Sequence, residues 1–200
     1  TWAPLALLAS GDKNDLPFVE RCVRHLCRTT KSKDDASLIN WHYMAAAIVQ
    51  SEYYLATKQA WVLPELREVH TFLAASQYLD MAQIDPRSKQ SHPGSYPQNA
   101  QDSHGGWGHN PGFEGYGPIC MLTGQGALAF ALMHRCGISI DRSKHDAAYA
   151  FLARATGPNG YVWYEDEVGD ASGWADLGRT GAAGLANLLS PYPDPAYRQR

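Results

Sequence analysis

The side chains best suited to acid–base or metal chemistry gather first in one glycine-rich stretch. His104, His109, Glu114 and Cys120 all lie within HGGWGHNPGFEGYGPIC. Imidazole, carboxylate and thiolate groups are the usual ligands of zinc. Two histidines separated by a flexible glycine loop permit ligation but are not diagnostic of it. Histidines that cap backbone groups explain the pattern better, so we predict neither a metal ion nor another cofactor.

A second group of acidic residues follows in a later loop and comprises Glu165, Asp166, Asp170 and Asp176. Neighbouring carboxylates drive their pKa values apart, which suits general acid and base catalysis. Paired carboxylates on facing loops also suit glycoside chemistry. A solvated acidic loop or a calcium-stabilised turn would contain the same residues. If the domain is an enzyme, we expect catalysis to depend on His109, Glu114, Asp166 and Asp176.

Both loops also contain aromatic residues that could stack on sugar rings or enclose an apolar ligand. If the domain is a binding module, we expect ligand contacts from Trp107, Tyr116, Trp163 and Trp174. His42 and Tyr43 begin a nearby helix and could face the same space. The alternative is that the aromatic side chains pack successive helices against each other.

The elements that must position these loops are all predicted to be helices, because no segment shows a sustained alternation of apolar and polar residues. Apolar residues recur at spacings of three and four, as in amphipathic helices, while two segments are apolar nearly all round. The sequence predicts helices at 16–28, 36–60, from Pro64 to Leu79, 118–136, 142–155 and 175–189, with a long connection at 85–117.

An internal repeat organises the second half of the chain. Two segments align with each other: Thr123-Gly-Gln-Gly-Ala-Leu-Ala and Thr180-Gly-Ala-Ala-Gly-Leu-Ala. A glycine–aromatic loop sequence precedes each of them at a similar distance, GGWG before the first and NGYVW before the second. The unit is an amphipathic helix, a glycine–aromatic loop and a buried helix of small residues. Such repeats form solenoids or closed rings, and alternation of all-round apolar helices with one-sided ones favours a ring.

The stretch GGWGHNPGFEGYGPICMLTGQGALAFAL resembles the repeat of the terpenoid cyclase and protein prenyltransferase superfamily. It is most similar to an uncharacterised bacterial branch found in large multidomain proteins. The resemblance implies an all-α, α/α-toroid fold. The D-x-D-D acid motif of the protonating cyclases does not occur, and Pro118 stands where the prenyltransferases have the aspartate of their Asp-x-Cys zinc pair.

Size and charge limit the partners that we expect. The 200 residues fit one toroid-like domain spanning 1–200, or part of one, so we expect an incomplete ring that other segments of a parent chain complete. A net charge of −3 without a basic stripe argues against a nucleic-acid surface. We predict no membrane span, and we expect the four cysteines to be free thiols, because they show no metal-type CxxC pairing.

Three functions therefore remain open. The domain could be an enzyme that acts on a carbohydrate or an isoprenoid-like substrate at the ring mouth. It could be a non-catalytic module that binds a glycan or a peptide, or a structural scaffold within a larger protein. The fold does not decide between them, because one fold hosts many functions.

Overall fold

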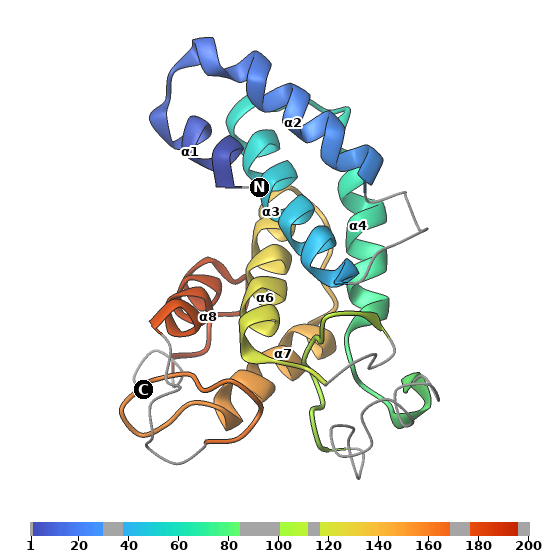
Figure 1. The fold of residues 1–200 in the computed structure, drawn as a ribbon, viewed down its shortest axis with the longest axis vertical. Helices are drawn as coiled ribbons and strands as arrows, with labels where there is room; N and C mark the ends of the chain where they lie inside the picture. Colours follow the sequence, from blue (N-terminus) through green and yellow to red (C-terminus); the bar gives the residue numbers. More distant parts are fainter. Residues whose placement is uncertain (1, 30–37, 85–100, 112–116, 169–176, 196–200) are drawn as a thin grey trace.

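The computed structural model describes residues 2–29, 38–84, 101–111, 117–168 and 177–195, and in these ranges the protein is all-α (Figure 1). This confirms the all-α part of the predicted fold class. Outside the helices, the described backbone forms one isolated antiparallel bridge, between Thr156 and Val162. No helix among the described residues has the length and apolar character needed to cross a membrane.

The helices lie close to the segments predicted for them. They are α1 (Trp2–Ser10), α2 (Leu16–Thr29), α3 (Ile39–Thr57), α4 (Val62–Ser76), α6 (Cys120–Arg135), α7 (Arg142–Arg154) and α8 (Leu177–Leu189), with short 3₁₀ turns at Lys13–Asp15 and Met81–Gln83. The expected helix over 36–60 is shorter, because Leu38 adopts a left-handed φ of 71° directly before α3. The expected stripe from Pro64 to Leu79 ends at Ser76, so Leu79 lies outside α4.

The helices α3 and α6 pack side by side at the centre of the molecule. Each also contacts the next helix along the chain, α4 for α3 and α7 for α6. The helix α1 packs on α3, and α8 packs on α6. In Figure 1, α1 and α8 lie on the left of the central pair and α4 lies on the right, whereas α2 runs across the top.

Burial explains this arrangement. The central helices α3 and α6 are buried on most sides, as their nearly continuous apolar sequences predict. The flanking helix α4 buries a single stripe, formed by Val62, Leu66, Val69 and Leu73. Residues at spacings of three and four share one face of a helix, so α4 covers the core with that face and exposes the other.

The side chain of Trp107 enters the core from the glycine-rich loop. It is 0% exposed, its indole N–H donates to the Leu73 carbonyl at 2.9 Å, and its ring meets Phe130 edge-on. Gly126 makes room for the ring, since a Cβ at that position would lie 2.9 Å from Trp107 Cε3. Trp107 is therefore a core residue of this structure, and its ring joins the loop to α4 and α6.

The internal repeat has a structural counterpart. The Thr123 hydroxyl accepts the Trp107 backbone N–H at 3.1 Å. In the second unit the Thr180 hydroxyl accepts the Val162 backbone N–H, also at 3.1 Å. The aligned threonines thus make the same contact to the loop that precedes each helix. Each holds a buried or half-buried backbone donor that would otherwise be unpaired.

Candidate functional site

A cavity of about 470 Å³ lies between α1, α2, α3 and α6. Its volume is within the range of sites that bind small molecules. The lining residues come from four helices and comprise Trp2, Leu5, His25, Leu26, Trp41, His42, Ala45, Ile48 and Gln125. Trp2 and Trp41 belong to the first turns of α1 and α3, so the cavity is close to the N-terminal ends of these two helices.

The cavity wall is largely apolar, with a small set of polar groups. Leucine, isoleucine, alanine and tryptophan side chains form most of the lining, and Trp2 is 78% exposed. Among the described residues that line the cavity, the polar members are His25, His42 and Gln125, and none is a carboxylate. Such a wall suits a ligand with an apolar body and one polar end, because the apolar surface removed from water drives binding while a few polar groups orient the ligand.

Of the residues predicted as catalytic, His109 lies beside this cavity. Its Nδ1 accepts the indole N–H of Trp41 at 2.7 Å, and the two rings stack with an interplanar angle of 22°. Burial lowers the pKa of His109. His42 lines the cavity as expected for a residue at the start of an inner helix, whereas Tyr43 stacks on Phe72 with ring centroids 3.6 Å apart.

The backbone around His109 is fixed to the first turn of α3. The Ile39 N–H donates to the Asn110 side chain at 2.9 Å, and the Asn40 N–H donates to the His109 carbonyl at 3.0 Å. The Asn40 amide donates in return to the Gly108 carbonyl at 2.9 Å. The loop therefore caps α3, since the first N–H groups of a helix have no partner within it.

Asp166 occupies a different setting, in which it joins two loops. Its carboxylate accepts the Ser103 backbone N–H at 2.7 Å and lies 3.4 Å from Arg154 Nη2. The same guanidinium donates to the His104 carbonyl at 2.7 Å. Through these contacts Asp166 holds the loop around Ser103 and His104 against its own loop.

Two other predicted residues lie in the same region. The buried Cys120 donates its thiol to the Glu165 carbonyl and its backbone N–H to the Tyr164 carbonyl. The half-buried Trp163 packs its indole nitrogen against Gly157 and has no hydrogen-bond partner for that N–H within the described part of the chain. The predicted Glu114, Tyr116, Asp170, Trp174 and Asp176 lie outside the described residues.

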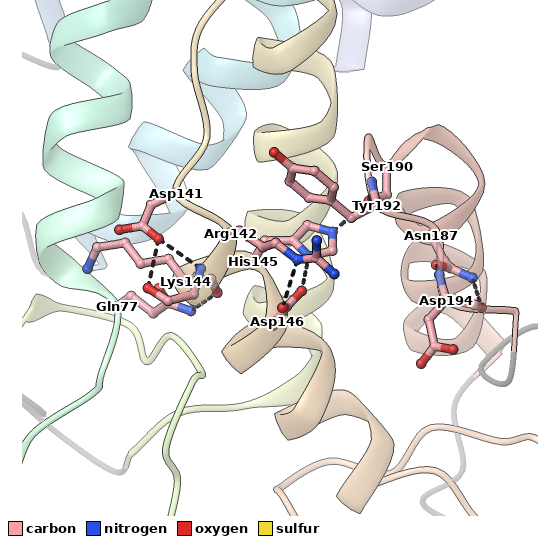
Figure 2. A network of polar contacts seen from close by, with 11 residues as sticks. Gln77, Asp141, Arg142, Lys144, His145, Asp146, Asn187, Ser190, Tyr192 and Asp194 are labelled. Carbon is pink, nitrogen blue, oxygen red and sulfur yellow. Dashed lines mark hydrogen bonds and ion pairs between the residues drawn. The ribbon is translucent and has the colours of Figure 1, made fainter.

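A polar network that the sequence patterns did not indicate joins α7 to the segment after α8 (Figure 2). His145 Nδ1 lies 2.9 Å from the Asp146 carboxylate, and His145 Nε2 lies 2.6 Å from the Ser190 hydroxyl. With the proton on Nδ1, the histidine donates to the aspartate and accepts from the serine. This order of contacts is that of a serine–histidine–aspartate triad.

The surroundings of this network favour a structural role. Ser190 is only 8% exposed, and its hydroxyl oxygen already accepts the Tyr192 backbone N–H at 2.9 Å. The Tyr192 ring also covers His145 edge-on, with centroids 5.3 Å apart. The Asp146 side chain is 55% exposed and pairs with Arg142 at 3.4 Å. A nucleophile needs open space for the substrate carbonyl, and here that space is filled, so the network fastens the segment after α8 to α7.

The sequence patterns pointed to His42, which lines the cavity, but not to the other half of the wall. Trp2, Leu5, His25 and Leu26 lie on two helices whose patterns indicate only amphipathic packing. The serine–histidine pair is separated by 45 positions, so no local spacing could reveal it. Among the described residues, no group of three or more His, Cys, Asp or Glu could hold a metal ion, and all four cysteines are free.

Comparison with known proteins gives a family. The model of the family described as "Domain of unknown function (DUF6288)" matches residues 1–192. No curated protein and no solved structure matches the chain significantly. Because the match covers nearly the whole sequence, the chain belongs to the DUF6288 family.

Proposed function

We propose that this chain is an arc of the α/α-toroid type whose cavity binds an isoprenoid-like small molecule. Two observations support the arc: α1, α3, α6 and α8 are neighbours in that order, and α4 and α7 flank α3 and α6. The cavity lies near the N-terminal ends of α1 and α3, where the mouth of such a ring is expected. The observation that carries the proposal is the lining itself, apolar and aromatic with two histidines and one glutamine.

The lining favours a hydrocarbon ligand over a sugar. A glycan presents many hydroxyl groups, each of which loses water on binding and needs a polar partner. The part of the wall that the structure describes offers three polar side chains for that purpose. A glycan stays the second candidate, because Trp2 and Trp41 could stack on sugar rings. We propose binding rather than turnover, because the described residues of the lining include no carboxylate to act as an acid or a base.

The test is a binding comparison by calorimetry with farnesol, farnesyl diphosphate and maltotetraose. Ala45 lines the cavity on α3, so Ala45→Phe should fill part of it and weaken binding of the isoprenoids. Ala56 is exposed on the same helix and does not line the cavity, so Ala56→Phe is the matched control. Equal affinities for the two variants would place the ligand elsewhere. Binding of maltotetraose alone would replace the proposal with the glycan module.

A further inference from the structure

We infer that His109 is a positioning residue for the cavity: its imidazole holds the indole of Trp41 in the orientation that forms one wall. The inference rests on the proposed function, since it assigns a task within the same site. It replaces the acid–base role predicted for His109 with a role that acts through Trp41.

The hydrogen bond between the two side chains fixes the protonation of the imidazole. An indole N–H is only a donor, so Nδ1 of His109 must provide a lone pair to accept it. The proton of the neutral ring therefore resides on Nε2. The nearly parallel stacking adds a second constraint, because it limits rotation of the indole about the hydrogen bond.

The imidazole is itself held in place, so the constraint acts on Trp41. The Asn40 N–H donates to the His109 carbonyl, and the Asn40 side-chain amide donates to the Gly108 carbonyl. The Ile39 N–H donates to the side chain of Asn110, so the loop that bears the imidazole is held against α3. With the backbone of His109 held in this way, a change of the Trp41 rotamer would break its hydrogen bond to the imidazole. Trp41 is half-buried and lines the cavity, so its orientation determines the shape of that wall.

Acid should release this constraint. Protonation of Nδ1 removes the acceptor and sets an N–H group against the indole N–H. Burial lowers the pKa of His109, so the ring is neutral near pH 7 and becomes charged only below the ordinary histidine value of 6.5. The other titratable groups of the cavity are His42 on α3 and His25 on α2. Their contribution to a pH profile is measured separately with His42→Asn and His25→Asn.

Nuclear magnetic resonance of the tryptophan indole protons tests the contact without any ligand. The wild-type Trp41 signal, assigned from Trp41→Phe, should move between about pH 7.5 and about pH 5 as the imidazole is protonated. In His109→Asn, the amide oxygen keeps an acceptor that does not titrate, so the signal should stay near its neutral position. In His109→Leu, it should shift at every pH. Trp107, whose indole donates to a backbone carbonyl, is the internal control and should not move. A Trp41 signal that is the same in all three proteins would overturn the inference.

Ligand affinity provides the second readout. Farnesol should bind His109→Leu about tenfold more weakly than wild type, a loss that corresponds to about 1.4 kcal/mol. His109→Asn should bind near wild-type strength with a flatter pH profile. Equal affinity of the leucine variant and wild type would also refute the positioning role. If farnesol binds none of the proteins, the proposed function fails, while the indole signals still decide whether His109 orients Trp41.

Discussion

Replacement of Gly126 by alanine tests the packing of the Trp107 loop against α6. A Cβ at position 126 would lie 2.9 Å from Cε3, 3.0 Å from Cζ3 and 3.1 Å from Cδ2 of Trp107. The ring is fully buried and hydrogen-bonded to Leu73, so it has little freedom to move aside. Overpacking of this kind costs about 1–3 kcal/mol, whereas alanine in place of glycine gains about 1 kcal/mol within a helix. We therefore expect Gly126→Ala to lower the free energy of unfolding by about 0–2 kcal/mol.

The matched control is the same substitution on another helix. Gly184 is exposed on α8, and a Cβ there would meet nothing within 4 Å. Gly184→Ala should therefore raise the free energy of unfolding by about 1 kcal/mol. Urea denaturation of both variants should give a difference of about 1–3 kcal/mol between them.

A double-mutant cycle attributes this difference to the ring. In a Trp107→Leu background the clash is removed, so the penalty of Gly126→Ala should largely disappear. If Gly126→Ala instead stabilises the protein as much as Gly184→Ala does, the contact between Gly126 and Trp107 is not present in solution. In that case the Trp107 ring would not require glycine at position 126.

Three further predictions concern polar groups. Ser190→Ala leaves buried His145 Nε2 without its partner, so urea denaturation should show that the free energy of unfolding falls by about 1–3 kcal/mol. The wild-type protein should resist labelling by a fluorophosphonate, and labelling of Ser190 would contradict the structural role. Thr123→Val keeps the shape of the side chain but removes the hydroxyl that accepts the Trp107 backbone N–H, so urea denaturation should show a similar loss in the free energy of unfolding. An unchanged free energy of unfolding would show that this hydrogen bond does not form. Burial and the nearby Lys144 lower the pKa of His70, and burial lowers the pKa of His109, so the unfolded chain takes up protons before the folded chain does as acid is added. The free energy of unfolding should therefore be at its full value above the ordinary histidine pKa of 6.5 and should fall as the pH drops below it. If the same fall persists in the double variant His70→Gln, His109→Asn, it has another origin.

The helices could be predicted from the sequence where the apolar pattern that defines them lies within one continuous segment. The stripe of α4 and the continuous apolar sequence of α3 each depend on residues within one helix, and both helices form close to the predicted ranges, with shorter ends. The aligned threonines likewise make equivalent contacts, because each binds the loop directly before it.

The site was harder to predict because it depends on which segments meet. Nothing near Trp107 in the sequence indicates that Gly126, in a later helix, leaves space for its ring, so the loop position alone suggests a ligand contact. Trp2 and His25 become cavity residues only because α1 and α2 pack beside α3. Asp166 similarly has its role determined by Ser103 and Arg154, which come from two other segments.

The position of Trp107 also bears on how the protein unfolds. Its indole bonds to the end of α4, its amide bonds to α6, and its carbonyl accepts the Ile119 N–H just before α6. Trp107 therefore connects the hairpin of α3 and α4 to the hairpin of α6 and α7 through its side chain and its backbone. Repeat proteins often lose their units one at a time, because each unit contacts only its neighbours. Here the α3–α4 and α6–α7 hairpins share a buried anchor, so they should melt as one cooperative unit.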